Sequence, residues 1–421
     1  MSRDSALSKS GWSRLVDERP ASHKKHAFKC YNNERTIAHV IQMVTHGLAK
    51  HYKNHRSVIF IADGGSTDDT REVARDFEIK PWQEKIVSIY RGPGGKGTAL
   101  RSVFEAAARL KVRVCAMVDA DLRSITDDWV RYLLDPVLEK GYEFVSPVYV
   151  RHKYDGTITN NIVYNLTRAL YGKRIRQPIG GDFALSRDVA KFYTEQDVWE
   201  TDVARFGIDI WMTTSAITQG FRICQSNLGV KIHDAKDPGE HLGPMFRQVL
   251  SALFSLMERN ESYWKKVKGS EPLETFGFEG SMEPEPLNVN LDLLVELFKT
   301  GYQQFSSLWK ETLSRESFDQ ITTSAQMESS EFHLPTGAWV KILYELAATY
   351  HLWTVNRNKL LDVMTPLYFS RVASFVRQSW DMSSHEAEAL VEEQAVKFEE
   401  NKAYLIKVWE EKSAEKALTR K

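Results

Sequence analysis

Cysteine is scarce in this sequence. The 421 residues contain three, Cys30, Cys115 and Cys224, which are far apart and form no Cys-x-x-Cys pattern. A disulfide framework or a zinc site is therefore not expected, because both need cysteines that can pair or cluster. Reduced thiols are typical of cytoplasmic proteins, and we expect this localisation.

Long apolar runs are also missing. No stretch approaches the ~20 residues that a membrane helix needs, and the polar segment 1–20 has no apolar centre like that of a signal peptide. We therefore expect no membrane partner. The absence also disfavours a transferase that acts on membrane lipid.

Neither sign of charge is in excess, since Lys plus Arg and Asp plus Glu each number 56. Without a net positive field the chain has no general attraction for nucleic acid, and we expect no such partner. At roughly 150 residues per domain, the length indicates two domains or one large domain with an appendage.

The chain divides into three parts by pattern. Residues 1–26 are polar and predict a flexible arm, and residues 27–245 alternate strand and helix patterns. The predicted elements of this part include strands over 57–62, 86–90 and 112–118, and helices over 69–77 and 98–110. Such alternation predicts an α/β fold with a mainly parallel sheet, which binds ligands at the carboxyl ends of its strands.

Residues 246–421 are predicted to form a helical C-terminal region. One apolar stripe recurs at helical spacing, at Leu291, Leu294, Phe298, Tyr302, Phe305 and Trp309. Ser383 and Glu386 have the spacing of a capping box. The charged stretch 266–285 either separates the two regions or forms a mobile loop.

An Asp-x-Asp motif, Asp119 to Asp121, follows the predicted strand 112–118. Two carboxylates on a loop at the end of a buried strand suit a hard divalent cation and the phosphates that it carries. The motif is common by chance, but Asp63 ends a second strand upstream. We therefore interpret both as part of a ligand site.

Two further loops have alternative interpretations. The segment 63–70 could bind a nucleobase through Asp63, or be an ordinary strand-to-helix turn with an N-cap. The glycine-rich segment 91–97 could offer backbone N–H groups and Lys96 to a diphosphate, or be a turn with a solvated lysine. The Asp-x-Asp motif nearby favours the ligand-binding interpretation of both loops.

The segments at 31–34, 63–68, 95–97 and 119–121 resemble, in order and spacing, nucleotide-sugar glycosyltransferases of the GT-A fold. The segments 177–184, 206–209 and 227–233 are similar to those of the retaining glucosyl-3-phosphoglycerate, mannosylglycerate and glucosylglycerate synthases. The resemblance covers about residues 27–250. It implies a GT-A catalytic domain with an appended helical region.

The resemblance also implies roles for the donor-site residues. A nucleoside-diphosphate sugar, with GDP, UDP or ADP as the nucleotide, would be bound by Tyr31, Glu34, Asp63, Ser66, Lys96, Asp119, Ala120 and Asp121. Asp121 and His233 would share Mg²⁺ or Mn²⁺ with the diphosphate, and Asp119 would contact the ribose or stand behind the metal ligands. Gly180, Gly181 and Asp182 would face the sugar and the acceptor, and Asp209 would bind hydroxyls of the transferred hexose.

The acceptor segment differs from that of the phosphoglycerate-using relatives. These have an arginine in a Gly-Arg-x-Thr segment, whereas this chain has Gly156 to Thr159 without one. Loss of a guanidinium removes the group best suited to a phosphate. The resemblance therefore favours Arg151 and Thr159 as ligands of D-glycerate. The alternative is that Arg151 and Lys153 lie on a solvated loop.

These observations predict a metal-dependent retaining hexosyltransferase that makes glucosylglycerate or mannosylglycerate, a compatible solute, with glucose favoured. One alternative is 3-phosphoglycerate as acceptor. A second is an inverting transferase acting on lipid or polysaccharide with Glu200 or Asp202 as base, and a third is a non-catalytic binding protein. We also expect a homodimer. The histidines at 39, 46, 51 and 55 are interpreted as part of an exposed helix without a metal role.

Overall fold

The computed structural model describes residues 24–30, 32–89, 94–233, 238–280, 283–353 and 355–419. Its contacts divide the chain into two compact units. The α/β unit comprises residues 1–150, 176–235 and 273–283, and the helical unit comprises 151–175, 236–272 and 284–421. The chain thus enters the helical unit three times, and the first entry, at 151–175, interrupts the region that alternates strands and helices.

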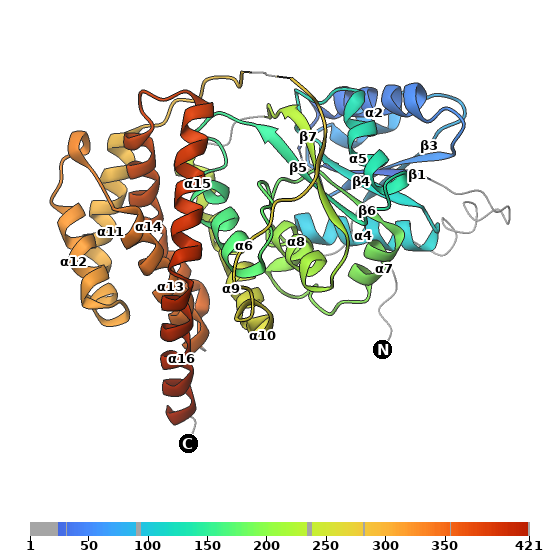
Figure 1. The fold of residues 1–421 in the computed structure, drawn as a ribbon. Helices are drawn as coiled ribbons and strands as arrows, with labels where there is room; N and C mark the ends of the chain where they lie inside the picture. The colour runs from blue at the N-terminus through green and yellow to red at the C-terminus, as the bar shows by residue number, and fades with distance from the viewer. Residues whose placement is uncertain are drawn as a thin grey trace. The chain divides into compact units, whose positions relative to one another are not determined.

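The α/β unit is built on a mixed sheet with the strand order β3-β2-β1-β4-β6-β5-β7-β8 among the described residues (Figure 1). The strands are β1 Lys24–Cys30, β2 Ser57–Asp63, β3 Glu84–Ile89, β4 Val114–Asp119, β5 Phe144–Val150, β6 Phe183–Ser186, β7 Ile223–Val230 and β8 Thr275–Gly277. β6 runs antiparallel to both of its neighbours, β4 and β5, and the other pairs are parallel.

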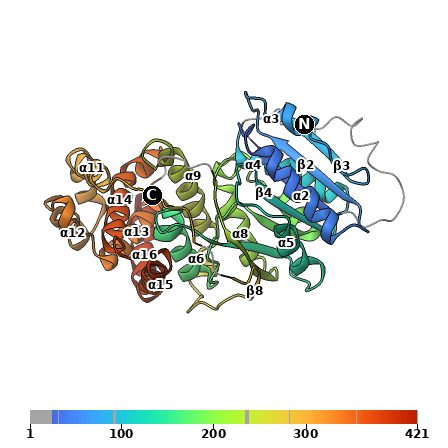
Figure 2. The ribbon, with the colours of Figure 1, turned by 90° about the horizontal axis from the view of Figure 1, so that it is seen from above.

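Helices cover both faces of this sheet. Their bounds are α2 Ile37–His51, α3 Thr70–Asp76, α4 Lys96–Arg109, α5 Asp128–Leu138, α7 Arg187–Thr194 and α8 Ile208–Thr218, with the short 3-10 turn η2 at Asp202–Ala204. Helices α2 and α5 lie on one face and α4, α7 and α8 on the other (Figures 1 and 2). The predicted alternation of strands and helices is confirmed, with ends that differ from the expected ones by a few residues.

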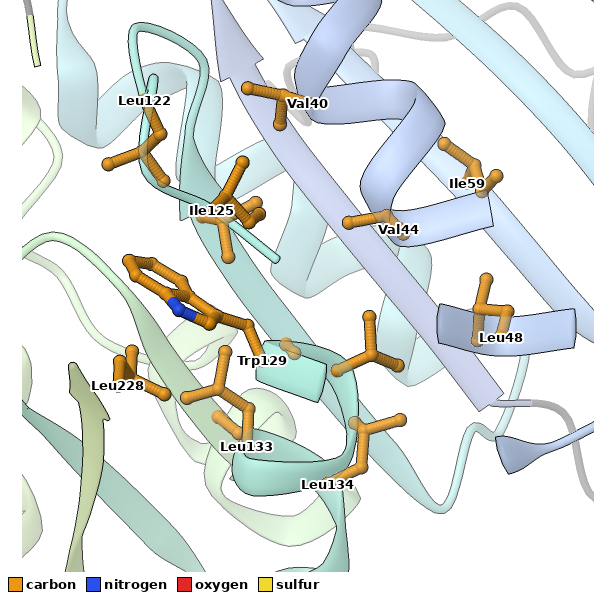
Figure 3. Packing of buried hydrophobic residues seen from close by; sticks show 14 of the residues in the cluster. Val40, Val44, Leu48, Ile59, Leu122, Ile125, Trp129, Leu133, Leu134 and Leu228 are labelled. Atoms are coloured by element: carbon orange, nitrogen blue, oxygen red, sulfur yellow. The ribbon is translucent and has the colours of Figure 1, made fainter. Parts of the chain in front are cut away.

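The core on the α2 side corrects one expectation. The segment with four histidines was expected to be an exposed helix, but Val40, Val44 and Leu48 of α2 are buried against the sheet and α5, near Ile59 and Trp129 (Figure 3). The apolar residues recur every three or four positions, which the interspersed histidines conceal. Burying each such side chain contributes roughly 1.5–3 kcal/mol.

The charged stretch 266–285 also adopts structure. Within it, β8 pairs with β7, with Ser226 opposite Phe276, and the Gln225 N–H donates to the Glu274 carbonyl at 2.8 Å. Phe276 packs against Tyr142, with ring centroids 5.7 Å apart. The stretch therefore supplies a strand to the α/β unit.

The helical unit contains a π-helix, η1 Thr159–Val163, followed by α6 Tyr164–Tyr171. Its later elements are α9 Pro238–Arg259, α10 Glu261–Trp264, α11 Leu291–Thr312, α12 Arg315–Ala325, η3 Ser329–Glu331, α13 Thr336–Leu352, α14 Arg357–Gln378, α15 Ser384–Glu400 and α16 Lys402–Thr419. α13 packs against α16, α11 against α14, and α6 against α15. None of the described helices is long and apolar enough to cross a membrane.

Two sequence signals in this unit are confirmed. The stripe over 291–309 lies on α11, where Leu294, Phe298 and Trp309 are buried. The capping box before α15 is present: the Ser383 hydroxyl accepts from the Glu386 N–H, and the Glu386 carboxylate accepts from the Ser383 N–H. The predicted helical C-terminal region is therefore confirmed.

Candidate active site

The sheet topology places Asp63 and Asp119 on either side of the end of β1. Cys30, the last residue of β1, pairs with Asp63, and Lys29 pairs with Asp119. These strands are parallel, so both carboxylates lie at the carboxyl edge of the sheet.

The antiparallel strand β6 brings further groups to the same edge. Phe183 pairs with Met117 in β4, so Asp182, immediately before β6, lies beside the end of β4. On the other side of β6, the parallel strands β5 and β7 end with Val150 paired with Val230. Lys231, which follows β7, therefore lies beside Asp182, although the two are 49 residues apart in sequence.

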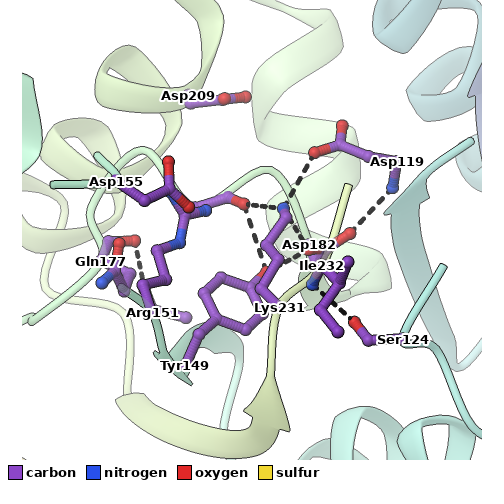
Figure 4. A network of polar contacts seen from close by, with 12 residues as sticks. Asp119, Ser124, Tyr149, Arg151, Asp155, Gln177, Asp182, Asp209, Lys231 and Ile232 are labelled. Atoms are coloured by element: carbon purple, nitrogen blue, oxygen red, sulfur yellow. Dashed lines mark hydrogen bonds and ion pairs between the residues drawn. The ribbon is translucent and has the colours of Figure 1, made fainter. Parts of the chain in front are cut away.

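Lys231, directly after β7, is the centre of a buried network (Figure 4). Its Nζ donates to Asp119 Oδ2 at 3.1 Å, to Asp182 Oδ2 at 2.8 Å and to the Gly180 carbonyl at 2.8 Å. The Tyr149 hydroxyl also donates to Asp182, and the Asp119 N–H donates to Asp182 Oδ1 at 2.8 Å. The Asp182 carboxylate is thus held from three directions.

The second lysine of the network is Lys96, the first residue of α4. Its Nζ lies 2.5 Å from Asp209 Oδ2 and 3.5 Å from Asp119 Oδ1. Burial lowers the pKa of Lys96, but the charges of Asp119 and Asp209 outweigh it, and the pKa lies above its usual value. Lys96 is therefore a permanent cation beside Asp119.

Asp182 and Asp209 differ in how fully the protein satisfies their carboxylates. Burial raises the pKa of Asp182, Lys231 opposes this shift, and the nearby charge of Asp119 adds to it. Asp209, in the first turn of α8, is 5% exposed, and its Oδ1 has no hydrogen-bond partner among the described residues. A buried carboxylate oxygen without a partner is costly, which marks Asp209 Oδ1 as an acceptor for a ligand hydroxyl.

Residue 181 has to be a glycine because the Asp119 carboxylate lies close to its backbone. Its φ is +90°, and a Cβ at this position would lie 2.1 Å from Asp119 Oδ2. A side chain would therefore be strained and would displace the carboxylate. The turn Gly180 to Asp182 and the Asp-x-Asp motif are in direct contact.

Gly97 has a different role from the predicted one. Its N–H donates to the Arg205 carbonyl at 3.2 Å, and a Cβ there would lie 1.9 Å from the Val203 carbonyl oxygen. This N–H is engaged within the protein and the glycine allows close packing against η2. Of the glycine-rich loop, residues 90–93 lie outside the described residues.

The predicted nucleotide-binding residues form an interlocked pair of loops. Asp63 accepts from the Gly65 N–H at 3.2 Å and from the Ser66 N–H at 3.1 Å, and Ser66 Oγ donates to it at 2.5 Å. Ser66 Oγ in turn accepts from the Asn32 N–H, and Glu34 accepts from the Asp69 N–H. Asp63 therefore shapes its own turn, and its contact with a base stays a prediction. Tyr31 lies outside the described residues.

The predicted metal ligands are adjacent. Leu122 and His233 form an antiparallel bridge, and the Arg123 N–H donates to the Ile232 carbonyl at 2.9 Å, which brings Asp121 beside His233. The Asp121 carboxylate forms no hydrogen bond or ion pair with any residue that the structure describes. Ala120 between the two aspartates is buried, and its carbonyl accepts from Thr36 Oγ1 at 2.8 Å.

These residues fit a divalent cation that is shared with a ligand. The described residues contain no group of three or more His, Cys, Asp and Glu side chains that could hold a metal by themselves. Asp121 and His233 would supply two ligands, and a diphosphate would supply the others. Asp119 is engaged by Lys96 and Lys231, so we expect it to support the site and not to bind the cation.

The predicted acceptor residues belong to the helical unit. Arg151 Nη1 lies 3.6 Å from Asp155 Oδ2, and Thr159 begins the π-helix η1. Lys153 is not on a solvated loop, because its Nζ donates to the carbonyls of residues 379, 380 and 382 at 2.6, 2.9 and 2.6 Å. That part of the alternative is wrong. The binding of an acceptor by Arg151 and Thr159 stays a prediction.

Lys231 and Tyr149 were not predicted as site residues from the sequence. Lys231 lies two residues before His233, within the segment 227–233 that carries part of the resemblance. It directly follows a strand, and Asp63 and Asp119 are the last residues of theirs. The rule that ligand sites form at the carboxyl ends of strands could have identified it. Nothing in the sequence indicated a site role for Tyr149, because a single tyrosine is common in an apolar strand.

Comparison with known proteins gives a family match for one segment of the chain. Residues 28–191 match the sequence model of glycosyl transferase family 2. This segment is a glycosyltransferase family 2 domain. The predicted GT-A fold class and the assignment as a glycosyltransferase are thereby confirmed. Comparison with curated proteins found no match.

Solved structures of glucosyl-3-phosphoglycerate synthase from Mycobacterium tuberculosis are similar to this chain. The complex with Mg²⁺ and UDP has 24% identity and a TM-score of 0.46, over 56% of this chain and 79% of that chain. The complex with Mn²⁺, UDP-glucose and phosphoglyceric acid has 22% identity and a TM-score of 0.45, over 61% of this chain and 86% of that chain. At these values the likeness assigns no substrate to this chain.

Proposed function

We propose that this protein is a metal-dependent retaining glycosyltransferase that transfers a hexose, with glucose favoured over mannose, from a nucleoside-diphosphate sugar to D-glycerate. The observation that carries the donor half is the network of Lys96, Lys231, Asp119, Asp182 and Asp209 at the carboxyl edge of the sheet. A cytoplasmic homodimer, as expected from the sequence, is part of the proposal.

The donor would be held by charge complementarity. The network leaves one formal negative charge in excess, since three carboxylates face two ammonium groups, and Asp121 adds a second. Mg²⁺ or Mn²⁺ on Asp121 and His233 would balance these charges and offset the charge that develops on the departing diphosphate. Lys96 would turn from Asp209 toward a phosphate oxygen, and Asp209 would accept from a hexose hydroxyl.

The acceptor half rests on Arg151. Its Nη1 lies 3.6 Å from Asp155 Oδ2, and its side chain is 15% exposed. A planar guanidinium suits the carboxylate of glycerate, and Thr159 would contact the same acceptor. The segment Gly156 to Thr159 lacks the additional arginine expected for a phosphate, which favours glycerate over 3-phosphoglycerate.

Retention would follow from attack on the same face of the sugar as the leaving group. Asp119 and Asp182 are both bonded to Lys231, so neither is an available nucleophile. An oxygen of the departing diphosphate would take the proton of the glycerate 2-hydroxyl while the oxygen of this hydroxyl group attacks the anomeric carbon. The bond from this carbon to the phosphate oxygen breaks in the same event.

The inverting alternative needs Asp202 or Glu200 as base. Asp202 begins η2 and lies 3.9 Å from Arg205, and Glu200 is exposed. Neither belongs to the network. We expect Asp202→Ala to retain activity, and loss of turnover in that variant would favour the inverting alternative.

One experiment tests the proposal as a whole. The protein would be incubated with UDP-, GDP- and ADP-hexoses and with either glycerate or 3-phosphoglycerate, in Mg²⁺ or Mn²⁺, and the products examined by NMR. We expect an α-linked hexosylglycerate and loss of turnover in EDTA. A β-linked product would exclude retention, and a strong preference for 3-phosphoglycerate would exclude the acceptor assignment.

A further inference from the structure

Lys231 follows the end of β7 and joins it to the end of β4 and to the turn before β6. Its side chain is 3% exposed, and its ammonium group bonds two carboxylates and a carbonyl. These acceptors lie on Asp119, Asp182 and Gly180, between 49 and 112 residues away in sequence. The Nζ also lies 4.8 Å from the centre of the Tyr149 ring.

The two carboxylates would repel each other without this ammonium group. Asp182 is completely buried, and the charge of Asp119 disfavours its ionised form. Removing the cation from such a cluster leaves buried charges without compensation, which is strongly unfavourable. Asp119 or the turn Gly180 to Asp182 would then have to move.

The two lysines of the network differ in what they can reach. Lys96 bonds Asp209, whose other carboxylate oxygen lacks a partner, so the pair can open toward a ligand. Lys231 is bound by groups that are themselves fixed: Asp182 also accepts from Tyr149 and from the Asp119 N–H. Lys231 is therefore placed to hold groups of the protein.

We propose that Lys231 is a positioning residue: it holds Asp119 and the turn Gly180 to Asp182 in the arrangement that receives the donor hexose. This proposal rests on the proposed function, because it assigns these groups to the sugar end of the donor. Lys231 acts through Asp182 and Asp119 and does not bind the diphosphate. Its removal therefore lowers the rate of transfer more than the affinity for the nucleotide.

The central experiment compares Lys231→Met with Lys96→Met and with a control, Lys85→Met. Lys85 also donates to two carbonyls, at 2.7 and 2.5 Å, but on the far side of the α/β unit in β3. We expect kcat of Lys231→Met to fall about 100-fold, as for a misplaced reacting group. The Kd for UDP or GDP with Mg²⁺, from calorimetry, changes less than about threefold, whereas Lys96→Met weakens it by about tenfold or more.

Two results would overturn the proposal. One is a kcat of Lys231→Met within about threefold of the wild type. The other is a rise in nucleotide Kd equal to that of Lys96→Met, which would make Lys231 a phosphate ligand. If Lys231→Met does not fold, Lys231→Arg keeps the charge but cannot place one nitrogen on three acceptors. We then expect Lys231→Arg to lower kcat, although by less than Lys231→Met, and to leave the Kd for the nucleotide nearly unchanged.

A double-mutant cycle tests whether Lys231 acts through Asp182. If it does, adding Asp182→Asn to Lys231→Met lowers kcat little further, because both changes release the same turn. Independent, multiplicative losses would contradict the proposal. Hydrogen exchange gives a readout without turnover: the Asp119 amide, which donates to Asp182, exchanges faster in Lys231→Met. If the wild type transfers no hexose, the proposed function fails, while unchanged exchange would refute the role of Lys231 itself.

Discussion

The two units use buried charge in different ways. In the α/β unit it gathers at the strand ends, where among the described residues Asp209 Oδ1 has no hydrogen-bond partner and the Asp121 carboxylate forms no hydrogen bond or ion pair. In the helical unit, Arg168 joins Glu392 and Glu399 of α15, at 2.6 and 3.1 Å. Charge that the fold leaves unsatisfied is available for a ligand, whereas satisfied charge holds helices together.

Glu345 of α13 is a second example from the helical unit. Its carboxylate accepts from the N–H and hydroxyl of Ser314, from Ser317 and from Tyr404. Ser314 is the N-cap of α12, Ser317 lies in its first turn, and Tyr404 lies in α16, so protein groups satisfy the carboxylate. We therefore expect substitutions in the two units to separate into losses of activity and losses of stability.

The largest effect is expected for Asp121→Ala. If Asp121 holds the cation, kcat/KM falls roughly 1000-fold or more, because the metal offsets charge in the transition state by several kcal/mol. The melting temperature without metal stays near that of the wild type, since the carboxylate has no described protein partner. Calorimetric titration with Mn²⁺ provides the direct measurement, and undiminished Mn²⁺ binding would contradict the assignment.

The opposite result is expected for Arg168→Met. Breaking the buried contacts of this arginine costs about 2–4 kcal/mol of unfolding free energy, less than for a fully buried pair because Glu392 is partly exposed. Urea denaturation measures this loss. The activity of the folded fraction stays near that of the wild type. A large loss of kcat without a loss of stability would remove the distinction between the units.

We expect Gly181→Ala to lower both kcat and the free energy of unfolding, each by a smaller amount than in the two preceding variants. The added methyl group meets Asp119 Oδ2, and the φ of +90° disfavours alanine, at a cost of about 1–3 kcal/mol in stability. We expect kcat to fall about tenfold to 100-fold because Asp119 is displaced. Gly220→Ala is the matched control: its φ is +76°, but no atom lies within 4 Å of the new methyl group. Equal activity losses in both variants would assign the effect to backbone strain alone.

The smallest effect concerns Lys402, at the start of α16. Burial lowers its pKa to about 8, although the charge of Glu399 opposes this. A folded-state pKa below the unfolded value means that protonation disfavours the fold, so stability rises as the pH increases from about 8 to about 10.5. We expect Lys402→Met to reduce this rise by about 1–3 kcal/mol in denaturation at pH 7 and pH 10. Lys407→Met, on the exposed side of α16, should leave the rise unchanged.

Much of the donor site could be predicted from local patterns. Asp63 and Asp119 each end a buried strand, and Lys96 opens a helix after a glycine-rich turn, so chain position alone indicated a shared edge. The capping box at Ser383 and the stripe on α11 are equally local. Such features depend on neighbours within a few residues, and a single sequence contains them.

Other features escaped prediction because they depend on pairing over long distances. The buried face of α2 was hidden by four histidines, and β8 by its charged surroundings. Nothing in segment 151–175 indicated that it belongs to the helical unit. The packing role of Gly97 was hidden for the same reason: its neighbours Val203 and Arg205 became known only when the loops were placed beside each other.

The sequence by itself determined the alternation of strands and helices, the carboxylates at the strand ends and the helical C-terminal region, because hydrophobic periodicity and turn chemistry are local. Only the tertiary structure decided that Lys231 joins Asp119, Asp182 and Gly180. That contact requires β6 to lie antiparallel between β4 and β5, with β7 alongside β5. Strand order is set by the packing of the whole unit, and no local pattern contains it.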